Sequence, residues 1–300
     1  MIIGSQVSMT GERMLLGAAE TAKLNHSNAF MVYTGSPQNS KRKPISDYKI
    51  KEAHSFMRAN KMKPYHLIVH APYILNLGNS KNKKLHEFSI KFLKEEITRA
   101  ESMGATQVVL HSGSHIGEGV QKGIAQIVIG LNEVLNRSSK IQISLETMSG
   151  RGTEIGSTIE EISEIISGVK FSENLSVTFD TCHLNDAGYD IKNDFDGVLE
   201  KFDKLIGIKK LKVIHLNDSK NVLGSRSDRH ENIGFGRIGF DSLNYIAHHP
   251  QLEKIPKILE TPFVSISNKI SVPIDRFEID MLKKQKFTPE LLPEFLGGYI

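Results

Sequence analysis

Short runs of aliphatic and β-branched residues recur along the chain, and six of them end in a His, Asp or Glu side chain. A run of this kind is typical of a buried parallel strand where it leaves its sheet. The runs predict eight strands, at Ile2–Gly4, Ala29–Tyr33, His66–His70, Gln107–His111, Ile141–Glu146, Leu175–Asp180, Leu211–His215 and Ile255–Glu260.

Segments with helical spacing of apolar residues lie between these runs. Gly104 stands where a helix C-terminus favours the left-handed conformation, and the segment Ser157-Thr158-Ile159-Glu160 resembles a helix N-terminus with a capping hydroxyl. The expected helices include Leu85–Met103, Ile159–Ile166, Val198–Ile206 and Phe240–Ala247.

Strand, loop and helix repeated eight times predict an α/β fold, a single-domain (β/α)8 TIM barrel over residues 1–300. Residues 286–300 hold two prolines and two glycines, and we expect them to form a tail packed on the barrel. A doubly wound open sheet is the alternative, but it usually binds its ligand at one switch point.

Composition adds few constraints. The chain is 39% hydrophobic and 24% charged, as is ordinary for a globular protein. Its single cysteine, Cys182, excludes an intramolecular disulfide and favours a reducing, cytoplasmic location. We expect no signal peptide and no membrane-spanning segment. The net charge of +4 permits a nucleic-acid partner without establishing one.

Six chemically similar side chains close the predicted strands. The carboxyl ends of barrel strands form one ring, so these side chains should converge. Burying several carboxylates without cations would cost several kcal/mol each, and divalent metals remove that cost. Imidazole and carboxylate without thiolate suit zinc, manganese or iron(II). The six residues are His70, His111, Glu146, Asp180, His215 and Glu260.

Three further candidate ligands follow closely. His183 comes one turn after the strand that ends at Asp180, and Asp228 and His230 have the i, i+2 spacing that points side chains the same way in an extended segment. We expect Cys182 to point away from the ligands, as a small core residue. Nine ligands are too many for one ion and fit two or three, with bridging carboxylates. Such clusters are typical of phosphoryl-ester hydrolysis.

Blocks at these residues resemble the endonuclease IV family of apurinic/apyrimidinic (AP) endonucleases. The resemblance rests on HAPYILNLG from His70, FDTCH ending at His183, and HLNDSK from His215 followed by DRHENIG from Asp228. With Glu146 and Glu260 at strand ends, it extends from about residue 4 to residue 262.

The resemblance implies a zinc-dependent enzyme that hydrolyses the phosphodiester bond 5′ to abasic sites in duplex DNA. The products would be a 3′-hydroxyl and a 5′-deoxyribose phosphate, and the activity would extend to 3′-blocking groups. About three zinc ions per chain are implied, with manganese an option at one site. The implied ligands are His70, His111 and Glu146 for the first ion, Glu146, Asp180, His215 and Glu260 for the second, and His183, Asp228 and His230 for the third. Glu260 and Glu146 would be catalytic.

DNA contacts are implied at the rim of the barrel. Tyr73 and Ile74 resemble the wedge that enters the duplex, although both could simply roof the barrel. The polar loop at 34–43 and the cations beside the third ligand group could equally be solvated charges. The other candidates are Gln38, Asn39, Lys41, Arg42, Lys220 and Arg229. Gln6 stands where the family commonly has His. We expect a monomer.

Two other functions compete with this one. A metal-dependent sugar isomerase or epimerase of the xylose-isomerase-like barrel group shares the architecture, but it would leave His70, His111, His183 and His230 unexplained. A DNA-lesion binding protein with a structural metal cluster would need only four ligands.

Overall fold

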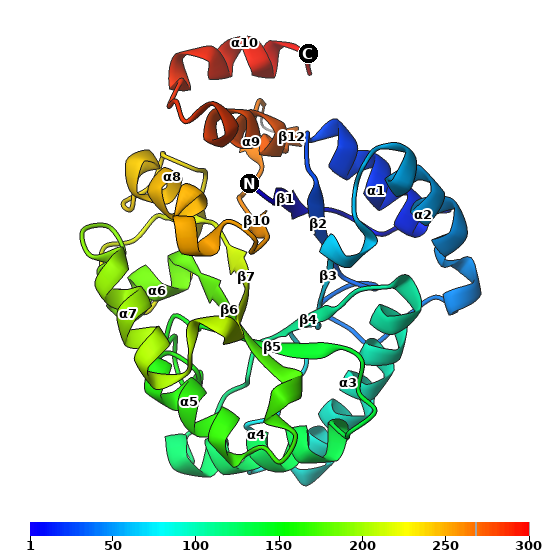
Figure 1. Ribbon diagram of the computed structural model, residues 1–300, viewed down its shortest axis with the longest axis vertical. Helices are drawn as coiled ribbons and strands as arrows, with labels where there is room; N and C mark the ends of the chain where they lie inside the picture. Colours follow the sequence, from blue (N-terminus) through cyan, green and yellow to red (C-terminus); the bar gives the residue numbers. More distant parts are fainter. Residues whose placement is uncertain (268, 300) are drawn as a thin grey trace.

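The computed structural model describes residues 1–267 and 269–299, and its centre is a closed barrel of eight parallel strands. Figure 1 shows the strands as a ring enclosed by helices. The order around the barrel is β1-β10-β7-β6-β5-β4-β3-β2, which confirms the predicted TIM barrel. The strands are β1 Ile3–Gln6, β2 Ala29–Val32, β3 Leu67–His70, β4 Gln107–Leu110, β5 Gln142–Glu146, β6 Leu175–Asp180, β7 Leu211–His215 and β10 Lys257–Leu259.

Several strand ends differ from the sequence prediction by one or two residues. His66 belongs to a 3-10 turn before β3, and its ring contacts the Asn28 carbonyl oxygen at 3.4 Å. β1 continues to Gln6 because that residue still pairs with Met31 of β2. His111 and Glu260 lie just beyond β4 and β10, where pairing with the neighbouring strands has ended.

Helices cover the outside of the barrel in the expected alternation. The Asn82 and Thr158 side chains cap α3 and α5 by accepting from Leu85 N and Glu161 N, and Gly104 ends α3 with a φ of 81°. The helices are α1 Met14–Leu24, α2 Ile50–Ala59, α3 Lys83–Met103, α4 Val120–Val134, α5 Ile159–Gly168, α6 Thr181–Ala187, α7 Phe195–Leu205, α8 Phe240–His248, α9 Asp275–Lys284 and α10 Leu292–Gly297.

Two apolar layers hold the barrel together. Alternate strand residues point inward and form a small cluster inside the ring, while the larger core lies between the strands and the helices. The inner cluster consists of Ala29, Met31, Ile68, Val109, Val213 and Ile258. Because the barrel interior is filled, a ligand can enter only at the mouth, where the polar strand ends lie.

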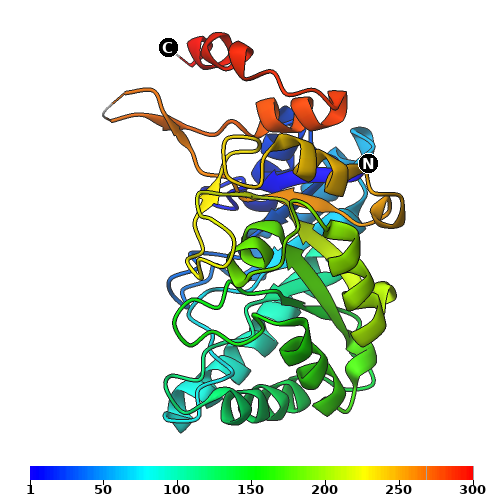
Figure 2. The same ribbon diagram turned by 90° about the vertical axis from the view of Figure 1, so that its left-hand side faces the viewer.

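The structure adds elements that the sequence patterns did not predict. Two antiparallel hairpins follow β7 and β10, formed by β8 Asp218–Ser219 with β9 His230–Glu231, and by β11 Val264–Ser265 with β12 Ser271–Val272. Figure 2 shows the second hairpin projecting from the barrel. In the tail, α10 packs Phe295 on Phe277 of α9, and Phe287 stacks on Phe240 of α8.

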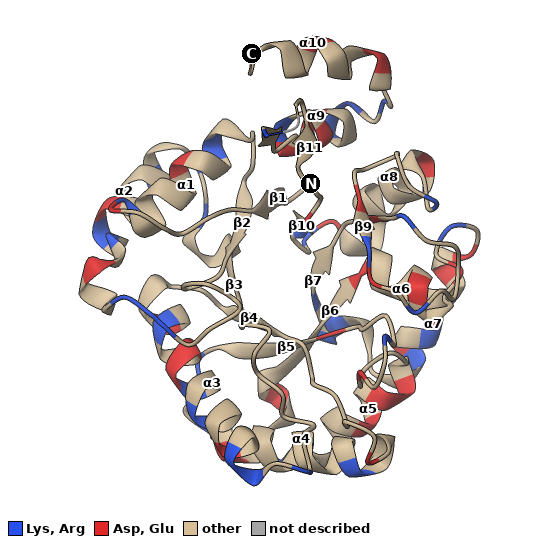
Figure 3. Cartoon of the chain, turned by 180° about the vertical axis from the view of Figure 1, so that it is seen from behind, with Lys and Arg blue, Asp and Glu red and all other residues tan. Residues whose placement is uncertain are grey.

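Charges are distributed over the outside without a dominant sign. Figure 3 shows Lys and Arg interspersed with Asp and Glu along the outer helices. Within the described residues, none of the helices has the length and apolar character needed to cross a membrane.

Candidate metal centre

All nine candidate ligands gather at the mouth of the barrel in overlapping groups, and three adjoining groups together contain all nine. Within each group the possible ligand atoms lie within 4.8 Å of one another. The groups are His70, His111 and Glu146; Glu146, Asp180, His215 and Glu260; and His183, Asp228 and His230. A cavity of about 550 Å³ opens above them and is lined by seven of these side chains. Convergence follows from the fold, because adjacent parallel strands end on the same side.

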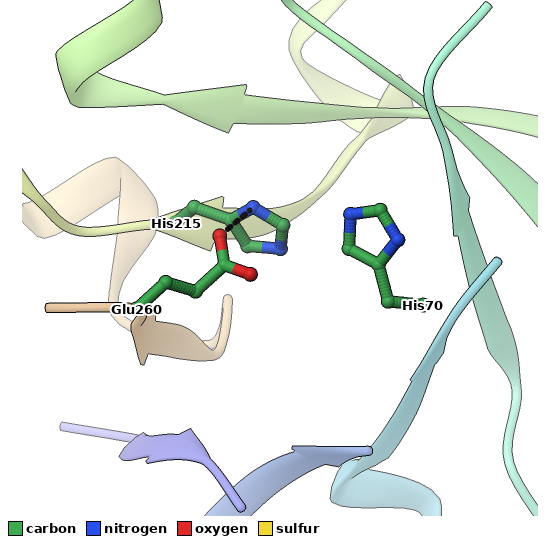
Figure 4. Close-up of side chains that lie close together, drawn as sticks. All are labelled: His70, His215 and Glu260. Atoms are coloured by element: carbon green, nitrogen blue, oxygen red, sulfur yellow. Dashed lines mark ion pairs between the residues drawn. The ribbon is translucent and has the colours of Figure 1, made fainter. Parts of the chain in front are cut away.

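Glu146 lies at the centre of the first two groups. Its Oε2 is 3.1 Å from the Nε2 atoms of both His70 and His111, and its Oε1 is 3.0 Å from Nδ1 of His215. The same His215 nitrogen is 2.9 Å from Oε2 of Glu260. Figure 4 shows the side chains of His70, His215 and Glu260 pointing toward one another. Glu146 is therefore placed as a bridging carboxylate would be.

The third group joins a helix to a loop. His183 lies on α6, and its Nε2 is 3.1 Å from Oδ1 of Asp228. The same Asp228 oxygen is 3.6 Å from Nε2 of His230. The i, i+2 spacing of Asp228 and His230 predicted an extended segment. Instead, Asp228 has a left-handed backbone, with a φ of 59°, and only His230 lies in a strand.

Cys182 also differs from expectation. The segment after Asp180 is helical rather than alternating, and the buried Cys182 Sγ lies within 4.8 Å of possible ligand atoms of Asp180 and His230. Burial and the nearby Asp180 carboxylate raise the pKa of this thiol far above its usual value. Its protonated form is a poor metal ligand, so the nine nitrogen and oxygen donors remain the set to consider.

Three histidine rings are oriented by backbone carbonyl groups. Nδ1 of His70 lies 2.7 Å from the Ala71 oxygen, and Nδ1 of His183 lies 2.8 Å from the Thr147 oxygen. Nδ1 of His230 lies 3.1 Å from the oxygen of Glu260. A carbonyl oxygen can only accept, so these Nδ1 atoms carry the proton and each Nε2 lone pair is directed into the centre.

The donor set fits divalent cations. Nε2 of His230 is buried and has no hydrogen-bond partner among the described residues. Buried polar atoms normally have a partner, and a bound metal ion would supply one here. Burial would raise the pKa of Glu146, but His215 and His111 hold it well below its usual value. Burial would likewise raise the pKa of Asp228, yet His183 lowers it to about 2. These two carboxylates thus stay ionised and need positive partners, which protons or metal ions can supply.

Asn217 supports two ligands at once and was missed by the sequence reasoning. Its side-chain amide donates to Oδ2 of Asp180 at 2.8 Å, and its carbonyl oxygen accepts from the Glu260 backbone N–H at 2.8 Å. Thr181 fixes the Asn217 backbone in turn through its hydroxyl. The only signal in the sequence is its position two residues after His215, at a strand end.

Comparisons with known proteins point to one family. A profile of the xylose isomerase-like TIM barrel family matches residues 19–284. The probable endonuclease 4 of Oceanobacillus iheyensis is 55% identical over 289 residues, covering 96% of this chain and 97% of the relative. That of Geobacillus kaustophilus is 55% identical over 296 residues, covering 99% and 98%. The chain belongs to the endonuclease IV family. Membership makes the protein an endonuclease of DNA repair.

Solved structures agree with this placement. Endonuclease IV from Thermus thermophilus superposes with a TM-score of 0.80 at 27% identity, covering 95% of this chain and 98% of that one. A D-tagatose 3-epimerase-like protein reaches a TM-score of 0.67 at 22% identity, over 99% of this chain and 100% of that one. The second likeness shows the fold alone.

Of the two wedge candidates in this endonuclease IV member, Tyr73 lies beside the candidate metal ligands. Tyr73 is 51% exposed and lines the cavity, with its ring centroid 5.4 Å from that of His111. It also meets the buried Tyr33 ring edge-on at 5.5 Å. Ile74 is only half-buried and packs against the main core. Tyr73 is thus free to contact a ligand, whereas Ile74 also supports the barrel.

Arg42, a candidate DNA contact on the loop at 34–43, is buried in the structure. Its side chain is only 1% exposed, and Nε is 3.0 Å from Oε1 of the buried Glu96 on α3. Nη1 donates to the backbone oxygens of Ser36, Asn39 and Lys41. An arginine held in this way cannot reach DNA phosphate. It ties the loop to α3, while the other loop candidates, Gln38, Asn39 and Lys41, remain exposed.

The remaining rim residues are exposed or line the cavity. Lys220 and Arg229 are both exposed, and Lys220 Nζ is 4.0 Å from Glu231. Gln6 lines the metal cavity at the end of β1. Arg151 lines it too, on the loop after β5, and the sequence reasoning did not single it out. It adds a cation to the lining of the cavity that holds seven of the candidate ligands.

Proposed function

We propose that this protein cleaves duplex DNA on the 5′ side of abasic sites, leaving a 3′-hydroxyl and a 5′-deoxyribose phosphate. The observation that carries the proposal is the arrangement of nine ligands in three adjoining groups, two of which share Glu146. About three zinc ions would fit these groups, with manganese an option at one of them. Zinc held by these residues would supply Lewis-acid chemistry, which activates water at neutral pH and offsets charge on phosphate oxygens.

The chain's own residues would orient the reaction. Glu260 and Glu146 both lie close to His215 Nδ1, at 2.9 and 3.0 Å, and would lie beside the attacked phosphorus. Asn217 holds the backbone of Glu260 in place. Arg151 and Tyr73 line the same cavity, so they would contact the phosphate and the sugar that lacks a base. The chain would act as a monomer and would also remove 3′-blocking groups.

A duplex with one tetrahydrofuran abasic analogue tests this function, because the analogue has no aldehyde and cannot undergo β-elimination. We expect cleavage at its 5′ phosphate, with a 3′-hydroxyl that a polymerase extends. Activity should be lost on chelation and restored by added zinc. Full activity without metal, or products of β-elimination from natural abasic sites only, would refute hydrolysis by a metal cluster.

A sugar isomerase or epimerase remains the alternative that the fold allows. The third group argues against it, because His183, Asp228 and His230 would have no role in a site built on one metal. Elemental analysis separates the two functions directly. About three zinc ions per chain would favour the nuclease, whereas a single manganese ion would favour the isomerase.

A further inference from the structure

Asp186 is a fully buried carboxylate that belongs to none of the three ligand groups. It lies on α6, three residues after His183, and so on the same side of the helix. Among the described residues it forms no ion pair with a cationic side chain. Its charge is compensated by four hydrogen bonds: Oδ1 accepts from Ser219 Oγ at 2.7 Å and Asn185 Nδ2 at 3.0 Å, and Oδ2 accepts from Asn221 Nδ2 and the Asp228 backbone N–H, each at 2.9 Å.

The loop at residues 221–229, which Asp186 contacts, has an unfavourable backbone conformation at two positions. Arg226 and Asp228 both have left-handed φ values, 51° and 59°, although neither is glycine. Such conformations persist only where the surroundings fix them. The Arg226 N–H donates to the Asp186 carbonyl at 2.9 Å, and the Gly224 N–H donates to the Asn185 carbonyl at 2.9 Å. The C-terminal end of α6 therefore holds the loop at several points.

This attachment sets the geometry of the third ligand group. His183 lies on α6, and Asp186 of the same helix accepts a hydrogen bond from the Asp228 backbone N–H. With both residues held by α6, His183 Nε2 lies 3.1 Å from Asp228 Oδ1. His230 follows at once, in β9, where it pairs with Ser219. Ser219 itself donates to Asp186. The positions of all three candidate ligands in this group therefore depend on the one buried carboxylate of Asp186.

We propose that Asp186 is a positioning residue that assembles the third metal site by fixing the Asp228 backbone. The inference rests on the proposed function, in which that group binds zinc. The negative charge matters because all four partners of the carboxylate are donors. In Asp186→Asn an amide N–H₂ would face two of these donors and leave them unpaired.

The test compares wild type, Asp186→Asn and a matched control, Asp194→Asn. Asp194 also accepts a backbone N–H, from Gly197 at the start of α7, but lies outside the site. Zinc content is measured after dialysis at fixed free zinc, and zinc affinity by competition with a chromophoric chelator. We expect wild type and control to bind three ions. Asp186→Asn should lose one, with affinity at that site about 10- to 100-fold weaker.

Hydrogen exchange provides a readout independent of metal content and activity. In metal-free protein, amides of residues 221–229 should exchange faster in Asp186→Asn than in wild type or the control, while the barrel strands stay protected. Cleavage by Asp186→Asn should recover at saturating zinc, because a positioning residue does not touch the substrate. If Asp186→Asn fails to fold, Ser219→Ala removes one donor and should produce the same changes to a smaller extent.

Unchanged zinc affinity and loop exchange in Asp186→Asn, or in Ser219→Ala if only that variant folds, would overturn the inference. A wild-type chain that binds no more than two ions would overturn it as well. Failure of the proposed function has a different outcome: wild type would not cleave the abasic duplex, while zinc counts and exchange would still report on Asp186.

Discussion

Glu278 on α9 predicts a pH-dependent stability that can be worked out from its surroundings. Its side chain is fully buried and accepts from the Ile233 backbone N–H at 2.7 Å and from Asn232 Nδ2 at 3.2 Å, while Oε2 lies 2.5 Å from the Thr261 hydroxyl. Burial is the main cause that raises the pKa of this carboxyl from its ordinary 4.5 to about 7, and nearby Asp275 adds to it.

The sign and size of the effect follow from this pKa. Between pH 4.5 and 7 the unfolded chain has released a proton that the folded protein retains, so stability falls as pH rises through that window. At 1.36 kcal/mol for each pKa unit, the loss is about 3 kcal/mol at most. Glu278→Gln keeps the shape and the acceptor oxygen but cannot ionise. Relative to wild type, we expect the variant to gain about 2–3 kcal/mol between pH 5 and pH 8.

Equilibrium urea unfolding followed by circular dichroism measures this difference directly. Wild type and Glu278→Gln are compared at several pH values and at fixed zinc, so that metal linkage is shared. Glu101→Gln, at an exposed position on α3, controls for the substitution itself and should show no pH-dependent difference. A difference between wild type and Glu278→Gln that stays constant from pH 5 to pH 8 would refute the reasoning.

Three further predictions concern the site. Glu260→Gln should retain the wild-type circular dichroism spectrum but lose turnover by orders of magnitude, since an anionic ligand is lost; near-normal steady-state rates would exclude that role. Arg42→Ala should destabilise the protein by about 3 kcal/mol in urea unfolding, because buried Glu96 loses its closer cationic partner and keeps only Arg99, 3.8 Å away, and adding Glu96→Gln should recover part of that loss; an additive double variant would disprove the coupling. Tyr73→Ala should raise KM for the abasic duplex about 10-fold or more with unchanged zinc content, whereas Tyr73→Phe should not; equal KM values for the two variants would exclude stacking by the ring.

The sequence determined the barrel and which candidate ligands would meet at its mouth. Parallel strands in a closed barrel end at one face, so residues that close apolar runs must converge there. His70, Glu146 and His215 could therefore be placed together without any structure. Local signals also sufficed for helix ends such as Gly104, because capping depends on a few neighbouring residues.

Tertiary structure alone decided how the loops meet those strand ends. Arg42 was a candidate DNA contact, or otherwise a solvated charge, but its guanidinium is buried against Glu96, 54 residues away in sequence. No sequence pattern singled out Asp186, yet it holds a loop whose nearest candidate ligand, Asp228, is 42 residues further along. Sequence patterns report which face of a strand or helix is apolar. They do not report which distant backbone N–H a buried carboxylate will accept, because that depends on how the loops pack over the completed barrel.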